Sequence, residues 1–456
     1  MTTYFYGIAL LQNLKIDDTQ PGTLLHDFQI MLDVFHSKEQ KLTATQQIPL
    51  SVIREINPRL KNPMDVRLKR SQQNSYPRIE GLYLLLRASG LTSLRTKGKT
   101  ARLIFDEEWL EQWNQFNPTE KYCHLLESWI IRGYEEILGG HANAFGISRT
   151  LDKIMTGYRQ ITAKGMKIKS YKHFRQEFSF YPQTYNLALM ELFGMVKIIE
   201  GKPVDGDGWQ VKKVERTKLG EALLAALFHA IYQPDDEVDD DDMEDFLGNL
   251  FNLDDDFDDE DDIEEPVLSE DEPEQPMQFS MLQPLLQEYF PAWQKTIEPP
   301  HREIMVGKFT FKVSLANQWS ATISLDGEQP MDSLASAILS AVQFDNDHLY
   351  EFTYKSRFGK QVSIPHPYSA EIYSTEEIAI GLPGFKPGTQ LKFIFDFGDW
   401  WEFDVVLEDY NPDKRTKKVE IISTTGEAPE QYPDWDDDDD DGDDDFESFA
   451  TGFDFD

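Results

Sequence analysis

The sequence predicts an α+β C-terminal domain, a mixed sheet with helices, that follows a mainly α N-terminal half. Three observations support this prediction. The N-terminal half shows helical stripes and short hairpins, a strongly acidic stretch interrupts the chain, and the C-terminal half mixes strands and helices without a regular βαβ repeat. The expected units are two winged-helix-like domains at 1–117 and 118–233, an acidic linker at 234–276, an α+β domain at 277–433 and an acidic tail at 434–456.

The first unit shows three helical stretches and then a hairpin. Apolar residues recur at helical spacing over residues 23–37, and further helices are predicted near 49–60 and 78–88. Two strands then surround residues 97–99, and a helix follows from residue 106. In DNA-binding winged helices the third helix enters the major groove and the wing contacts phosphates. The candidate nucleic-acid-binding residues here are Arg78, Arg87, Arg95, Lys97, Lys99 and Arg102.

The second unit contains a basic run with interleaved aromatic residues at 164–175. Such a run can bind phosphates and stack bases, or it can be an exposed face beside core aromatic residues. A helix, a hairpin and a closing helix then follow between residues 185 and 232, an order that resembles a second winged helix. The candidate nucleic-acid-binding residues of this unit are Lys167, Lys169, Lys172, Lys212 and Lys213.

Charge is divided unevenly along the 456 residues. Residues 1–233 hold 31 Lys and Arg against 24 Asp and Glu, whereas residues 234–456 hold 13 against 58, so the balances are +7 and −45. The linker and tail have too little apolar content to offset chain entropy, and we expect them to be disordered. Their apolar islands, at 246–253 and around Phe446, Phe449, Phe453 and Phe455, either dock on proteins or belong to purely solubilising segments.

The remaining bulk features point to a cytoplasmic protein without a membrane partner. A single cysteine, Cys123, excludes an internal disulfide and a cysteine-based zinc site. No apolar run is long enough to span a bilayer, and the first residues do not resemble a signal peptide.

Residues 391–409 predict a β-hairpin, because apolar side chains alternate on both sides of a turn at Gly398. The apolar face is expected to hold Leu391, Phe393, Phe395, Phe397, Trp401, Phe403, Val405 and Leu407. The turn and the other face gather Asp396, Asp399, Glu402 and Asp404, with His348 as a candidate neighbour. Such carboxylates can hold Mg²⁺ or Ca²⁺ or do acid–base work, but Asp and Gly in a turn usually serve the turn itself. We therefore expect a structural role, with no catalytic residue, no metal ligand and no cofactor.

Four stretches carry a family resemblance: KFTFKVSL, DHLYEF, FIFDFGDWWEFDVVLE and GEAPEQYPD. Together they resemble the plasmid Ri open-reading-frame-three-like family, whose members are also described as insertion-element passenger proteins. The resemblance covers about residues 300–435, and its signature residues are His348, Asp396, Gly398, Asp399, Trp401 and Glu402. It implies an α+β fold and an association with plasmids or mobile elements of bacteria or archaea, but no activity. Phe403 stands where members often have His, which argues against a metal or base at that position.

No other enzyme motif is present: the chain lacks GxSxG, a phosphate-binding GxxxxGK[ST], HExxH and a dinucleotide fingerprint. The sequence favours a non-enzymatic protein associated with plasmids or mobile elements. It would bind DNA through residues 1–233 or regulate through these basic units, with acidic segments modulating contacts and the Phe-bearing segments binding proteins. Two alternatives stay open: a metal-dependent enzyme that uses the carboxylates of residues 396–402, and a scaffold that binds only proteins.

Overall fold

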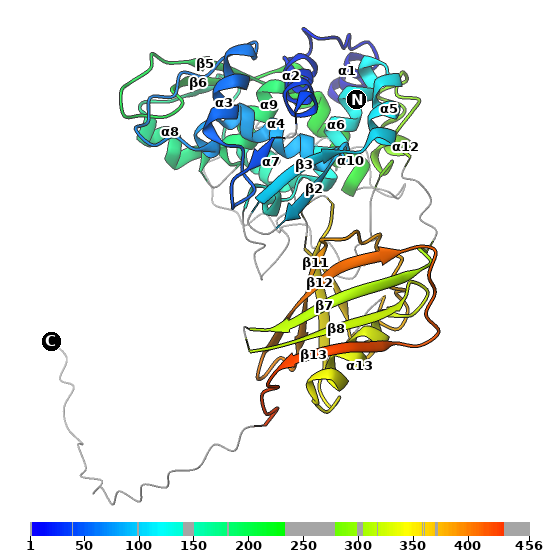
Figure 1. Cartoon of the computed structure of the whole chain (residues 1–456). Helices are drawn as coiled ribbons and strands as arrows, with labels where there is room; N and C mark the ends of the chain where they lie inside the picture. Colours follow the sequence, from blue (N-terminus) through cyan, green and yellow to red (C-terminus); the bar gives the residue numbers. More distant parts are fainter. Residues whose placement is uncertain are drawn as a thin grey trace, which may run out of the picture.

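The computed structural model describes residues 2–38, 40–97, 100–139, 150–179, 182–232, 279–298, 304–316, 318–357, 359, 361–369 and 373–432. The acidic linker and tail predicted from the sequence, with their Phe-bearing islands, lie outside these residues. Figure 1 shows a mainly helical N-terminal half above a C-terminal sheet. Each half has its own hydrophobic core. The expected fold classes of the two halves are therefore confirmed.

The first part of the chain forms the predicted helices and hairpin, preceded by an additional helix. Its elements are α1 (Thr2–Gln12), α2 (Leu24–Ser37), β1 (Lys41–Leu42), α3 (Leu50–Ile56), η1 (Asn57–Arg59), η2 (Gln73–Ser75), α4 (Pro77–Ala88), β2 (Thr92–Lys97), β3 (Thr100–Phe105) and α5 (Glu107–Gln115). The strands form an antiparallel sheet in the order β1-β3-β2. The Asp106 side chain accepts a hydrogen bond from the Trp109 backbone amide, so α5 begins where the sequence predicts.

The second part repeats this order of elements. It consists of α6 (Pro118–Arg132), η3 (Glu135–Leu138), α7 (Thr150–Arg159), β4 (Met166–Lys167), α8 (Tyr171–Phe178), α9 (Thr184–Leu192), β5 (Val196–Glu200), β6 (Val211–Arg216) and α10 (Lys218–Tyr232). Its sheet order, β4-β6-β5, matches that of the first part. Asn117 and Glu120 form a capping box at the start of α6. Pro118 suits the first helical position because the N–H that it lacks would have no acceptor within the helix.

The two parts share one core, because α4 and α9 pack directly on each other. Every residue of α4 is buried. Gly81 lies at the contact, where a Cβ atom would come within 2.7 Å of the Leu189 side chain and 3.2 Å of the Tyr185 carbonyl oxygen. A glycine is therefore needed for the close approach of these helices. The sequence did not reveal this, since it predicted two separate units.

Residues 279–298 also pack on the N-terminal core. This segment contains α12 (Leu282–Leu286), and its Trp293 is fully buried in that core. The Glu127 carboxylate on α6 accepts hydrogen bonds from the backbone amides of Ser280 (3.0 Å) and Leu282 (3.2 Å). The Glu120 carboxylate accepts another from Lys295 (2.9 Å). The structure therefore separates this segment from the C-terminal unit that was expected to begin at residue 277.

The C-terminal unit is a seven-stranded sheet in the order β10-β9-β11-β12-β7-β8-β13, and every pairing is antiparallel rather than mixed. Its elements are β7 (Lys308–Leu315), β8 (Trp319–Asp326), α13 (Met331–Val342), β9 (Tyr350–Lys355), β10 (Gln361–Pro365), η4 (Pro367–Ser369), β11 (Gln390–Phe395), β12 (Trp401–Asn411) and β13 (Glu420–Gly426). Helix α13 packs against β8 and β13. The predicted hairpin forms the centre of the sheet.

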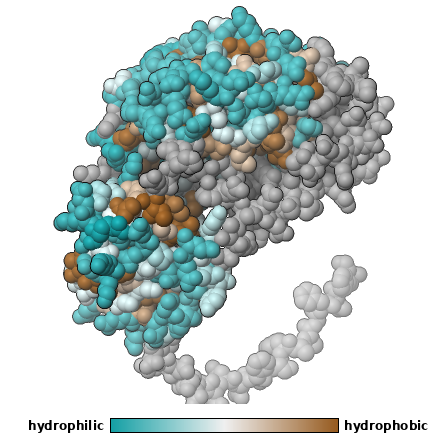
Figure 2. Space-filling view, turned by 90° about the vertical axis from the view of Figure 1, so that its right-hand side faces the viewer, coloured by the Kyte–Doolittle hydropathy of each residue, from teal (hydrophilic) through white to brown (hydrophobic). Residues whose placement is uncertain are grey.

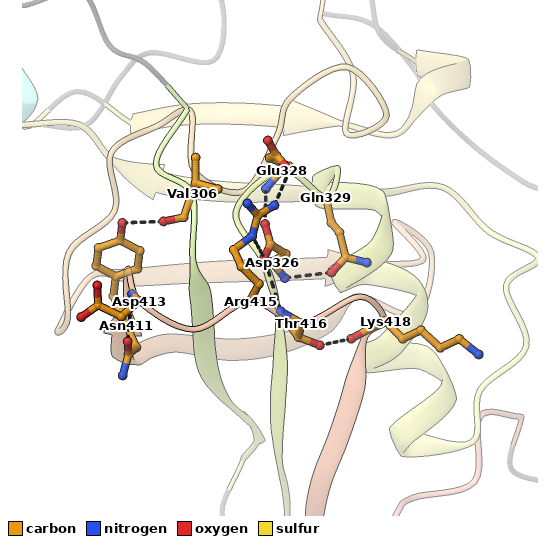
Figure 3. Close-up of polar contacts among 10 residues, drawn as sticks. Val306, Asp326, Glu328, Gln329, Asn411, Asp413, Arg415, Thr416 and Lys418 are labelled. Carbon is orange, nitrogen blue, oxygen red and sulfur yellow. Dashed lines mark hydrogen bonds and ion pairs between the residues drawn. The ribbon is translucent and has the colours of Figure 1, made fainter.

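A polar cluster holds the loop before the edge strand β13 against the loop after β8 (Figure 3). The Arg415 Nε atom donates to the Asp326 carboxylate at 2.6 Å, and a second guanidinium nitrogen pairs with Glu328. The Thr416 backbone amide also donates to Asp326, at 3.4 Å. Arg415 is about half exposed, so we attribute to the cluster a positioning role more than a large stabilisation.

Arg357, in the turn between β9 and β10, contacts the N-terminal half. Its guanidinium group donates to the Gly90 carbonyl oxygen at 2.6 Å and pairs with Asp106 at 3.2 Å. It also lies over the Trp109 ring, 4.1 Å from the centroid. On the face of the molecule drawn in Figure 2, the described surface is mainly hydrophilic, with a hydrophobic patch on the lower unit. No described helix is both long and apolar enough to cross a membrane.

Candidate functional site

The signature motif forms the turn between β11 and β12. Phe395 pairs with Trp401 as the last register pair, and residues 396–400 connect them. The Asp396 carboxylate accepts a hydrogen bond from the Gly398 backbone amide at 2.8 Å. The Asp396 carbonyl oxygen accepts another from the Trp400 amide at 2.7 Å. Asp396 therefore serves the turn itself, as the sequence led us to expect.

Gly398 was expected to give the backbone the freedom to reverse direction, but it does not adopt a left-handed conformation. The residues with left-handed backbone conformation are Asp396, at φ 55°, and Trp400, at φ 57°. A Cβ atom at Gly398 would lie 3.1 Å from the Asp396 carboxylate oxygen, so the glycine leaves room for that hydrogen bond. The apolar face is confirmed by the buried Phe393, Phe395 and Phe403, together with Leu391, Val405 and Leu407. Phe397 corrects the prediction: it lies in the turn beyond β11 and is exposed.

His348 lies beside this turn, in the loop that precedes β9. Its Nε2 atom is 3.5 Å from the Asp396 carboxylate and 3.1 Å from the Tyr432 hydroxyl. The Tyr432 hydroxyl donates to the Asp347 carboxylate at 2.6 Å. The Gln431 side-chain amide donates to Asp347 at 3.1 Å, and its carbonyl oxygen accepts from the Asp345 amide. The network therefore joins three segments that are distant in sequence.

The hydrogen bond between Tyr432 and Asp347 changes the acidity of both groups. Asp347 raises the pKa of Tyr432 to about 12, because the carboxylate stabilises the protonated hydroxyl. The same bond holds the pKa of Asp347 below its usual range. At neutral pH, Asp347 is consequently an anion and Tyr432 a neutral donor. The pair is suited to binding and positioning rather than to proton transfer near pH 7.

The structure separates the four carboxylates that the sequence grouped together. Glu402 and Asp404 lie on the other face of the hairpin, where both pair with Lys392, at 2.5 Å and 2.8 Å. Asp399 is exposed in the turn, and Asp396 faces His348. Within the described part of the chain, no group of three or more His, Cys, Asp or Glu side chains has the geometry to hold a metal ion. The metal-dependent alternative would need these carboxylates to converge.

Sequence reasoning missed three members of the network: Asp347, Gln431 and Tyr432. Asp347 lies in the stretch DHLYEF, and Gln431 and Tyr432 lie in the stretch GEAPEQYPD. The stretches that carry the family resemblance therefore already contained these three residues. What the sequence could not supply was the pairing of β13 with β8, which brings the following residues 431–432 back to the signature turn.

The candidate nucleic-acid-binding residues of the first unit are divided by burial. Arg78 is buried and pairs with Glu191 and Glu200, both at 2.8 Å. Arg87 is also buried, and it donates to the Tyr83 hydroxyl at 3.1 Å. These two arginines therefore cannot reach a DNA groove, which corrects the expectation drawn from the third helix. The reason is that α4 packs on α9 instead of facing solvent.

The hairpin of β2 and β3 in the first unit retains some surface charge. Arg95 is exposed on β2, and Arg102 is partly buried on β3, its register partner. The side chain of Lys97 is not among the described ones, and Lys99 lies outside the described residues. The sequence predicts strands on both sides of this turn, and they are confirmed.

The second unit presents a basic surface. Lys167, Lys169, Lys172 and Arg175 are all exposed along β4 and α8. The neighbouring strand β6 adds the exposed Lys212, whereas its Lys213 pairs with Glu215 at 2.6 Å. We name the exposed cations of 164–175, with Lys212, the α8 surface.

A hollow of about 680 Å³ opens on the α8 surface. It is lined by Ser170, Tyr171, Lys172, Arg175, Gln176, Ser179 and Asp207. Tyr171 can approach closely because Gly208 has no side chain: a Cβ there would lie 2.4 Å from the Tyr171 hydroxyl. The hollow combines two cations, one ring and several hydrogen-bonding groups, and one carboxylate limits its net charge.

Comparison with known proteins finds a matching family for the C-terminal unit. Residues 308–434 match the family described as plasmid pRiA4b ORF-3-like protein, which confirms the resemblance seen in the sequence. A crystal structure of a protein of unknown function from Methanosarcina mazei Go1 is similar, with 22% sequence identity and a TM-score of 0.23. The similarity covers 27% of this chain and 72% of that protein. No curated protein matches the sequence.

Proposed function

We propose that this chain is a plasmid- or mobile-element-associated protein that binds the nucleic-acid backbone through its N-terminal half and has no enzymatic activity. The plasmid association comes from the family of the C-terminal unit. The N-terminal half contributes two winged-helix-like units, an assignment supported by their repeated element order and by the matching sheet orders β1-β3-β2 and β4-β6-β5.

The observation that carries this proposal is the α8 surface. It comprises six exposed cations, Lys164, Lys167, Lys169, Lys172, Arg175 and Lys212, and two of them, Lys172 and Arg175, line the hollow. Phosphate contacts give affinity but little sequence information. The third helices, which read bases in DNA-binding winged helices, are buried. We therefore propose binding to DNA with low sequence preference.

The test measures the binding of the full chain to a fluorescent duplex of about 30 base pairs between about 50 and 200 mM salt, by fluorescence anisotropy. Each phosphate neutralised is expected to contribute about −0.9 to the slope of log affinity against log salt. Replacing Lys167, Lys169 and Lys172 by Glu should weaken binding by more than tenfold, because three attractive contacts become repulsive.

The matched control replaces three exposed lysines of the C-terminal unit, Lys386, Lys414 and Lys417, by Glu. Both triple variants change the net charge equally, so only a local contact separates them. Equal losses for the two variants, or no binding at about 50 mM salt, would contradict the proposal.

The acidic segments provide a second test. Residues 234–276 and 434–456 are rich in Asp and Glu and are tethered to the basic half. A tethered segment reaches an effective concentration on the order of millimolar, so it competes with DNA for the α8 surface. Removal of both segments should tighten DNA binding severalfold. Unchanged affinity would limit these segments to solubility or to contacts with other proteins.

A further inference from the structure

The signature turn presents large apolar side chains to solvent. Leu349, Phe397, Trp400 and Tyr432 are 39%, 44%, 53% and 47% exposed. They come from three segments that converge on Asp396, whose backbone amide bonds the Leu349 carbonyl oxygen at 3.0 Å. The rings of Phe397 and Trp400 lie 6.1 Å apart. Exposed apolar side chains that gather in this way mark an interaction site more often than isolated ones do.

The same three segments are strongly anionic. Residues 345–349, 396–400 and 427–432 contain six Asp and Glu, namely Asp345, Asp347, Asp396, Asp399, Glu427 and Glu430, and no Lys or Arg. The sequence continues after residue 432 with a long run of Asp. This end of the molecule therefore attracts cations over a distance, and the rings provide short-range contacts there.

We propose that these four apolar side chains and the surrounding carboxylates form a docking surface for a Lys- or Arg-rich segment of a partner protein. A guanidinium or ammonium group is attracted to the face of an aromatic ring, and the apolar stem of the same side chain packs on the ring. The negative charges of the nearby carboxylates complement the positive charges of such a segment. We refer to this area as the signature surface.

The surface is fixed before a partner arrives. Tyr432 is held by its hydrogen bond to Asp347, and His348 contacts both Tyr432 and Asp396. The Trp400 backbone amide donates to the Asp396 carbonyl oxygen at 2.7 Å, which holds the backbone of the turn at this residue. A preorganised site loses less side-chain entropy on binding, so weak individual contacts add up to a measurable affinity.

Among the described residues, the signature surface lies away from the contact between the two halves. It lies at the end of the sheet where β9 begins and β11 ends, because Phe395 pairs with Tyr350. Arg357 and its contacts with the N-terminal half follow the other end of β9. The basic α8 surface and the acidic signature surface therefore belong to different parts of the protein. The docking inference does not depend on DNA binding.

The experiment measures the binding of fluorescein-labelled octa-arginine to the full chain by fluorescence anisotropy. Trp400→Ala should weaken binding about fivefold, within the range of a single cation–π contact, and Trp400→Ala with Phe397→Ala by more than tenfold. Both variants keep every carboxylate, including those of residues 434–456. A loss of affinity thus reports on the rings and not on general charge attraction.

Tyr368→Ala supplies the matched control, because Tyr368 is 92% exposed on η4 and lies outside the signature surface. It should bind octa-arginine within twofold of the wild type. Thermal unfolding followed by circular dichroism checks that each variant is folded. Three results would overturn the inference: wild-type affinity in the double variant, equal losses in Tyr368→Ala, or a dimer in light scattering that Trp400→Ala abolishes, since a second copy would then be the occupant.

Discussion

The two halves of the molecule place their charged side chains differently. In the N-terminal half, Arg78 and Arg132 are buried and pair with buried or half-buried glutamates. In the C-terminal unit, ion pairs such as that of Lys392 with Glu402 lie at the surface, over a core of apolar residues. The comparison shows that a count of basic residues overstates the basic surface when two helical units share one core.

The largest expected effect on stability comes from removing a buried cation. Arg78→Met should lower the free energy of unfolding of the N-terminal half by about 3 to 5 kcal/mol, because Glu191 would remain buried without its partner. The exposed counterpart, Lys392→Met, should cost about 1 kcal/mol or less, because its partners Glu402 and Asp404 are themselves exposed. Chemical denaturation of both variants measures the difference. Adding Glu191→Met to Arg78→Met should restore part of the loss, and no recovery would contradict the ion-pair explanation.

The second prediction compares two rings of the signature hairpin. Phe403 is fully buried, so Phe403→Ala should destabilise the C-terminal unit by about 3 to 5 kcal/mol through lost burial and a cavity. Phe397 is exposed, and Phe397→Ala should cost about 0.5 kcal/mol or less. Calorimetry of the full chain separates the two cases. Similar costs would mean that Phe397 belongs to the core after all.

The third prediction concerns Glu80, a carboxylic acid buried on α4. Burial raises the pKa of Glu80 to about 7. Between the ordinary pKa of a glutamate and pH 7, Glu80 keeps its proton in the folded state and loses it in the unfolded chain. The free energy of unfolding therefore falls as the pH rises through this range. Glu80→Gln should remove this fall and add about 3 kcal/mol at pH 8, with little change near pH 4.

Urea denaturation from pH 4 to pH 8 measures this effect. Glu108→Gln, at an exposed position on α5, is the matched control and should leave the pH profile of the wild type intact. A Glu80→Gln profile that still falls between pH 5 and pH 7 would assign the pH dependence to another group.

The smallest expected effect concerns Trp400 and separates stability from docking. Because a φ of 57° is unfavourable for tryptophan but not for glycine, Trp400→Gly should stabilise the C-terminal unit by about 1 kcal/mol. The same change should weaken octa-arginine binding. Denaturation and anisotropy on one variant test both statements, and a destabilised Trp400→Gly would show that the ring packs more tightly than its exposure indicates.

Local patterns predicted most elements of this fold. The stripe of apolar residues in α2, the cap at Asp106 and the alternation in β11 and β12 depend on neighbours within a few residues. The carboxylate site could not be predicted in the same way. Alternation placed Glu402 and Asp404 on the polar face, but their pairing with Lys392 depends on the register between two strands.

The sequence by itself determined most helices of the N-terminal half, though not α1, α7 or α8, together with the central hairpin and the family resemblance of the C-terminal unit, because each follows from side chains close together in the chain. Only the tertiary structure decided which charges are exposed. Packing of α4 on α9 buries Arg78 and Arg87, and the course of β13 brings Tyr432 to His348. These outcomes depend on contacts between residues far apart in the chain, and no local period encodes such contacts.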